Sequence, residues 1–150
     1  MIKKVIGKFL KYGTLISTFG LIASVALQIY ARFFMSNTPA WTEEASRLFF
    51  IYTISFASGL ALKDNYFVYL DVFFERLKPS IQDKILLFIH LVIFVLFGLM
   101  FYHAVLFVKL GLPEKSASMG TSMSLTFFCM VIMSATMAYY SFLALLKRLK

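Results

Sequence analysis

The fold of this chain is decided by residues 85–108, which read ILLFIHLVIFVLFGLMFYHAVLFV. The stretch contains no Asp, Glu, Lys or Arg, and its only basic side chains are the imidazoles of His90 and His103. A helix that crosses the hydrocarbon layer of a bilayer, about 30 Å thick, needs about 20 predominantly apolar residues. This stretch therefore predicts a transmembrane helix.

Three further apolar runs predict three more spans. The first extends from residue 12 to 34, and the last lies inside the uncharged stretch 116–146, beginning near Met123. Residues 48–62 are uncharged but would cover only about 22 Å as a helix, so this span must begin earlier, near Trp41. Thr38 and Pro39 are suited to be its N-cap and first helical residue. We predict an all-α membrane protein, a single domain (1–150) with four transmembrane helices, at 12–34, 41–62, 85–108 and 123–146.

Composition supports a chain that is partly solvated by lipid. Of its 150 residues, 61% are hydrophobic and 15% are charged, whereas soluble domains average about 45–50% and about 25%. The net charge of +8 does not indicate a nucleic-acid partner, because the basic residues flank the apolar runs. Cys129 is the only cysteine, so no intrachain disulfide is expected. The first apolar run is longer than a signal peptide's and no A-x-A-like site follows it, so we expect it to be retained.

The distribution of basic residues predicts the topology. Four spans place both termini on one side of the membrane, and Lys and Arg concentrate on the cytoplasmic side. Eleven basic residues fall on the side of the termini and four on the other, so both termini are predicted to be cytoplasmic, in a bacterial inner membrane. The eleven are Lys3, Lys4, Lys8, Lys11, Lys63, Arg76, Lys78, Lys84, Lys147, Arg148 and Lys150; the four are Arg32, Arg47, Lys109 and Lys115.

The connection between the second and third spans predicts an amphipathic helix over residues 66–77. Its polar side chains recur with helical spacing and fall within a stripe about 60° wide. A straight continuation of the second helix would be about twice as long as the membrane is thick, so the chain must bend near residues 63–65. The helix would then lie along the membrane surface or against a partner. Its apolar side chains include Tyr66, Phe67, Leu70, Phe73, Phe74 and Leu77, and Pro79 should stop or bend it.

The start of the second span holds the most informative candidate site. Glu43 and Glu44 favour the positive end of the helix dipole, and each has the spacing of an ion pair with Arg47. Trp41 suits the membrane interface. One interpretation is a capped, interfacial helix start. The other is a polar contact with another subunit or a lipid, because a charge at the depth of Arg47 is costly unless it is paired or reaches the surface.

Other candidate chemistry finds little support in the sequence. His90 and His103 are roughly 20 Å apart along one helix, so they cannot bind one haem together, and packing roles are expected. Small residues such as Gly13, Gly20 and Gly59 favour close helix packing. We expect no metal, cofactor or enzyme activity, because no nucleotide-binding motif, metal-ligand cluster or nucleophile–base spacing is present. No carboxylate lies in the middle of a span, so the chain is not expected to transport by itself.

These residues carry a resemblance to a known family. The pattern of Trp41, Glu43, Glu44 and Arg47 at the start of a second helix resembles the small membrane subunit of tripartite ATP-independent periplasmic (TRAP) transporters, the DctQ-like or SiaQ-like family. Lys63 at the end of that helix and Asp71 eight positions later are also similar to this family. The chain departs from the family pattern at Asn65 and Phe67, where relatives often have Gly and His.

The resemblance implies a function and a set of partners. Such a subunit is a scaffold for a large, elevator-type membrane subunit that takes up organic acids, such as C4-dicarboxylates or sialic acid, with sodium. A periplasmic substrate-binding protein delivers the substrate, and membrane lipid surrounds both subunits. Trp41, Glu43, Glu44, Arg47, Lys63 and Asp71 are then candidates for contact with a partner or lipid. Alternatives are a small self-sufficient exporter, a membrane anchor of a respiratory complex, and an assembly protein.

Overall fold

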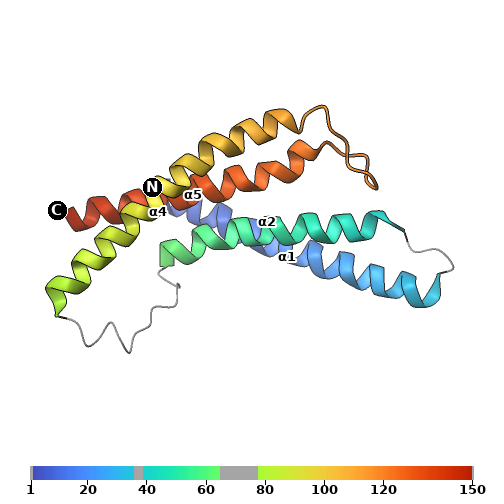
Figure 1. Ribbon diagram of the computed structural model, residues 1–150. Helices are drawn as coiled ribbons and strands as arrows, with labels where there is room; N and C mark the ends of the chain where they lie inside the picture. The colour runs from blue at the N-terminus through green and yellow to red at the C-terminus, as the bar shows by residue number, and fades with distance from the viewer. Residues whose placement is uncertain (1, 36–38, 65–77, 150) are drawn as a thin grey trace.

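The computed structural model describes residues 2–35, 39–64 and 78–149 of the chain, and these form four α-helices. They are α1 (Ile2–Phe34), α2 (Trp41–Asp64), α4 (Pro79–Leu110) and α5 (Met123–Leu149). Helices α1 and α2 pair as one hairpin, α4 and α5 pair as another, and the two hairpins meet where α2 packs against α5 (Figure 1). The described residues contain no strand beyond an isolated bridge between Lys115 and Ser122.

All four helices are long and apolar enough to cross a membrane, as the four apolar runs predict. The end of α2 and the start of α4 lie at the same end of the molecule as both termini (Figure 1). The end of α1, the start of α2 and the α4–α5 connection lie at the opposite end. The predicted interfacial helix, residues 66–77, falls outside the described residues and stays a prediction.

The helices extend beyond the predicted spans at the end that holds the termini. Helix α1 begins at Ile2, ahead of the predicted start at residue 12, and α4 begins at Pro79, ahead of 85. Lysines are good helix formers, so the basic segment before the apolar run continues the helix into the polar region. Pro79 occupies the first turn of α4, where its missing N–H leaves no hydrogen bond unmade.

Helix α2 begins at Trp41, as the predicted span 41–62 has it. Pro39, which was expected to be the first helical residue, lies just ahead of the helix. The carbonyl of Pro39 instead accepts hydrogen bonds from Thr42, 3.2 Å from the backbone nitrogen and 2.8 Å from Oγ1. The hydroxyl of buried Thr42 is thereby satisfied, and this bond fixes the entry of the chain into α2. Thr38, the predicted cap, lies outside the described residues.

Close approach of small and large residues joins the helices. A Cβ atom on Gly13 of α1 would lie 2.8 Å from the ring of Phe56, and one on Gly59 would lie 2.8 Å from Cβ of Thr136 in α5. The predicted packing role of these glycines inside the chain is confirmed. Around them lies a core made of Leu10, Phe56, Leu62, Met137 and Tyr140.

Two side-chain hydrogen bonds also connect the helices. The Tyr52 hydroxyl donates to the carbonyl of Leu125 at 2.6 Å and links α2 to α5. The buried Ser141 hydroxyl donates to the carbonyl of His90 at 2.6 Å and links α5 to α4. Inside a bilayer no water is present to replace a lost hydrogen bond. Hydrogen bonds between helices therefore favour the one helix register in which they can form.

Candidate functional site

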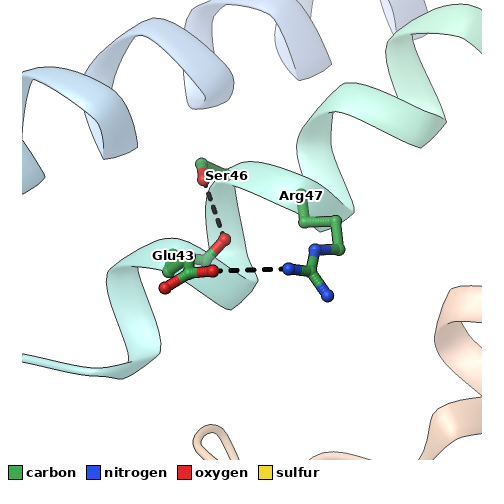
Figure 2. Close-up of polar contacts among 3 residues, drawn as sticks. All are labelled: Glu43, Ser46 and Arg47. Carbon is green, nitrogen blue, oxygen red and sulfur yellow. Dashed lines mark hydrogen bonds and ion pairs between the residues drawn. The ribbon is translucent and has the colours of Figure 1, made fainter.

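The start of α2 carries an exposed ion pair. Nη2 of Arg47 lies 3.3 Å from Oε1 of Glu43, one helical turn away, and the two side chains are 74% and 69% exposed (Figure 2). The Ser46 hydroxyl donates to the carbonyl of Glu43 at 2.8 Å. An exposed pair at this spacing stabilises a helix by only about 0.3–0.5 kcal/mol. Both charges are therefore available to a partner at little cost.

Glu44 has a different role from the one predicted. Arg47 pairs with Glu43, and the carboxylate of Glu44 is turned to the α4–α5 connection. There its Oε2 accepts backbone N–H groups from Ser118 at 3.1 Å and from Met119 at 3.0 Å. An ionised carboxylate that accepts two N–H groups makes stronger hydrogen bonds than a neutral acceptor. Glu44 thus ties the first hairpin to the connection of the second.

The connection that Glu44 holds is an ordered turn. The backbone N–H of Ser116 donates to the carbonyl of Thr121 at 2.8 Å, and that of Gly120 donates to the carbonyl of Ser116 at 3.1 Å. Gly120 adopts a φ of 66°, a conformation that other residues rarely adopt. A hollow of about 250 Å³ lies between this turn and α2, with a lining of Ala40, Glu43, Glu44, Arg47, Ala117 and Ser118.

Lys63 lies at the other end of α2, roughly 24 Å along the axis from Arg47. Its Nζ is 3.0 Å from Oδ1 of Asp64. The structure therefore divides the predicted contact residues into two groups and leaves no single site. Trp41, which is 45% exposed, belongs with Glu43, Glu44 and Arg47. Asp71, and with it Tyr66, Phe67, Leu70, Phe73, Phe74 and Leu77, lies outside the described residues.

The two histidines occupy separate environments. His90 is buried, and its Nδ1 lies 2.7 Å from the carbonyl of Leu86; because a carbonyl only accepts, Nδ1 must carry a proton. His103 is exposed and borders an apolar hollow with Leu99 and Met100 of α4 and Met130 of α5. Among the residues that the structure describes, no three His, Cys, Asp or Glu side chains gather as metal ligands.

Sequence reasoning missed the residues that meet Glu44 and the pair between Asp83 and Arg148. Oδ1 of Asp83 lies 2.9 Å from Nη1 of Arg148 and joins the start of α4 to the end of α5. The small and polar residues of 116–122 indicate a loop, but they do not identify the carboxylate that holds it. That partner is 74 and 75 residues away in the chain.

Comparison with protein families gives a match. The family model described as "Tripartite ATP-independent periplasmic transporters, DctQ component" matches residues 21–150. The matched region contains α2, α4, α5 and the last part of α1. A search of curated proteins finds no match.

Proposed function

The chain belongs to the DctQ family of TRAP transporters, and from this premise we propose that it is the scaffold subunit for a large elevator-type subunit in sodium-coupled uptake of an organic acid. The family is a component of transporters and is not an enzyme family. Its members function with a large membrane subunit and a substrate-binding protein. The four apolar helices and this membership make the chain a multi-pass membrane protein.

The observation that carries the proposal is the family match over residues 21–150, and the placement of acidic residues supports it. All seven carboxylates of the sequence fall outside the apolar runs 12–31, 48–62, 85–108 and 116–146. Secondary transporters place ion and substrate sites near the middle of the membrane, on broken helices. Here the ligands for sodium and for the organic acid, of the C4-dicarboxylate or sialic acid class, would belong to the large subunit.

The orientation of the chain follows from its charges. The excess of lysine and arginine on the side of the termini favours a cytoplasmic location for both termini in the bacterial inner membrane. The end that carries Glu43, Glu44 and Arg47 would then face the periplasm. Its exposed charges and Trp41 are available to the large subunit or to the substrate-binding protein. Residues 66–77, if they form the predicted interfacial helix, would widen the scaffold at the cytoplasmic surface.

Co-purification from membranes tests the proposed contact. The chain and the large subunit of the same transporter are co-expressed, and the complex is captured through a tag on the large subunit. We expect a stoichiometric complex, and we expect Glu43→Lys to weaken it on the order of tenfold, because a rim charge is reversed against a complementary partner. The control is Glu114→Lys, which makes the same charge change at an exposed position on the same side.

Two outcomes would count against the proposal. If the large subunit purifies and transports fully without this chain, the scaffold role is wrong. If Glu43→Lys and Glu114→Lys weaken the complex equally, the effect comes from net charge, and the start of α2 is not the contact.

A further inference from the structure

A basic hollow of about 880 Å³ lies between the first turns of α1 and the last turns of α2. Its lining includes five lysines but only one acidic residue, which leaves four positive charges unbalanced at neutral pH. The lining residues are Lys3, Lys4, Gly7, Lys8, Lys11, Leu60, Lys63 and Asp64. The excess of basic residues on the cytoplasmic side requires only that lysines be present at this end of the helices. It does not require them to line one hollow.

The helical spacing of α1 brings three of these lysines together. Lys4, Lys8 and Lys11 follow one another at intervals of four and three residues, which places them on one face of the helix. Within the described part of the chain, these three ammonium groups form no ion pair. Like charges at this spacing repel one another, so an anion in the hollow would relieve an unfavourable interaction.

Gly7 and Lys63 form the inner wall of the hollow. A Cβ atom at Gly7 would lie 3.0 Å from Cε and 3.2 Å from Nζ of Lys63, so the absence of a side chain at Gly7 lets this lysine lie against α1. The Lys63 side chain is only 25% exposed, and its charge is already paired with Asp64. Lys63 therefore shapes the hollow, while the α1 lysines supply its free charge.

The face of α1 beside the lysines is apolar and exposed. Val5, Phe9, Tyr12 and Ile16 are 62%, 58%, 61% and 69% exposed, and their spacing of four, three and four places them on a second face of the same helix. The long apolar run that begins at Tyr12 places Lys11 at the boundary between lipid and water. A soluble anion would use the lysines alone, whereas a phospholipid would use both faces.

We propose that this hollow binds the phosphate headgroup of an anionic phospholipid, with the acyl chains along the exposed apolar face of α1. Lys4, Lys8 and Lys11 surround the phosphate, and their stems cover part of the acyl surface. The site selects anionic over zwitterionic lipid, because a choline or ethanolamine cation would be repelled by the same lysines. The proposal rests on the membrane-spanning arrangement and not on the transport role, so either can fail without the other.

The test measures lipid binding to the full chain in a neutral detergent. Native mass spectrometry follows the bound lipid during titration with phosphatidylglycerol, with phosphatidylcholine, and with inorganic phosphate alone. We expect saturable binding of phosphatidylglycerol, at least several-fold weaker binding of phosphatidylcholine, and no binding of inorganic phosphate. In the variant Lys4→Gln, Lys8→Gln, Lys11→Gln, phosphatidylglycerol binding should weaken on the order of tenfold or more.

A matched variant separates the hollow from general charge. Lys78→Gln, Lys84→Gln, Lys147→Gln removes the same charge from exposed positions at the same end of the molecule. Because none of these three lysines lines the hollow, binding should stay within about twofold of the original. Gly7→Ala keeps every charge but displaces Lys63, and a few-fold loss is expected. It also serves as the decisive variant if the triple lysine variant does not fold.

Three results would overturn the proposal. Equal binding of phosphatidylglycerol and phosphatidylcholine would show that the lysines do not recognise the headgroup. Equal losses in the two triple variants would show a diffuse charge effect. Inorganic phosphate that occupies the site, or displaces the lipid at equal concentration, would identify a soluble anion as the ligand.

Discussion

The two ends of α2 both carry charged residues at a membrane boundary, but those charges have different surroundings. At the start, the carboxylate of Glu44, at the protein surface, accepts two backbone N–H groups of the α4–α5 connection. At the other end, the lysines of α1 converge on a hollow and, among the described residues, form no ion pair. The first arrangement orders a loop, whereas the second leaves charge available to something outside the chain.

This difference shows which charged groups are satisfied by contacts within the chain and which are available to a ligand or partner. Around Glu44 the backbone bonds of the turn and the φ of 66° at Gly120 define one conformation. Around Lys8 and Lys11 the charges repel, and within the described residues neither lysine forms an ion pair. Glu43 and Arg47, which pair on the surface, leave exposed charge at the start of α2.

The largest expected effect comes from Gly59, in the C-terminal part of α2, where this helix packs closely against α5. Gly59→Ala should lower the free energy of unfolding by about 1–3 kcal/mol, because a buried small-to-large change forces neighbours apart. The new Cβ would lie 2.8 Å from Cβ of Thr136, an atom close to the backbone that cannot swing away. Thermal unfolding in detergent measures the loss. Gly98→Ala is the control, since a Cβ there meets nothing within 4 Å; equal losses would contradict the packing of α2 on α5.

The next effect is local to the start of α2. Glu44→Ala removes the acceptor of two hydrogen bonds, so the amides of Ser118 and Met119 should exchange with solvent markedly faster. Hydrogen–deuterium exchange followed by mass spectrometry of the 111–122 segment measures the change. Glu43→Ala should leave this segment protected, because the carboxylate of Glu43 pairs with Arg47. Unchanged protection in Glu44→Ala would mean that the turn is held by its own bonds alone.

Ionic strength should separate the two ends. Raising the salt concentration from about 0.05 M to about 0.5 M shortens the Debye length several-fold, so binding of anionic lipid at the lysines should weaken. The same change should barely affect protection of the Ser118 and Met119 amides, because direct hydrogen bonds are screened far less. Lipid titration and hydrogen exchange at both salt concentrations test this contrast. Parallel loss at both ends would show that the turn, too, depends on long-range charge.

The smallest effect is expected where an ion pair joins α4 to α5 at the lysine end. Arg148→Gln should cost less than about 1 kcal/mol in unfolding free energy, because Asp83, its partner, is 77% exposed and solvent screens the pair. Chemical unfolding in detergent measures the cost, with Lys147→Gln as the neighbouring control. A loss as large as that of Gly59→Ala would show that the pair, and not helix packing, holds the second hairpin.

Much of the fold is predictable from composition because the bilayer restricts the choice of structure. Residues 85–108 and 123–146 have to be helical, since a backbone in lipid must satisfy its own hydrogen bonds, and α5 begins at Met123 as predicted. The start of α1 is less predictable, because Lys3 to Lys11 do not belong to the apolar run that defines the span. The required span length is enough to predict a start of α2 near Trp41, but nothing in the sequence shows that Pro39 would stay outside the helix and accept hydrogen bonds from Thr42.

The candidate sites are less predictable because they depend on contacts between distant residues. The spacing of Glu43 and Arg47 is enough to predict their pair. The spacing of Glu44 and Arg47 is equally suitable, yet Glu44 meets Ser118 and Met119, which only tertiary packing brings near. The helical spacing of Lys4, Lys8 and Lys11 is visible in the sequence, but the hollow exists only because α2 ends beside Gly7.

Reconstituted uptake tests the role of the chain most directly. Proteoliposomes hold this chain alone, the large subunit alone, or both, each with the substrate-binding protein, an organic acid substrate and an inward sodium gradient. A scaffold subunit predicts uptake only when both membrane subunits are present. Uptake by this chain alone would contradict that role and would point to a transport site within its four helices, while full uptake by the large subunit alone would show that the chain is dispensable.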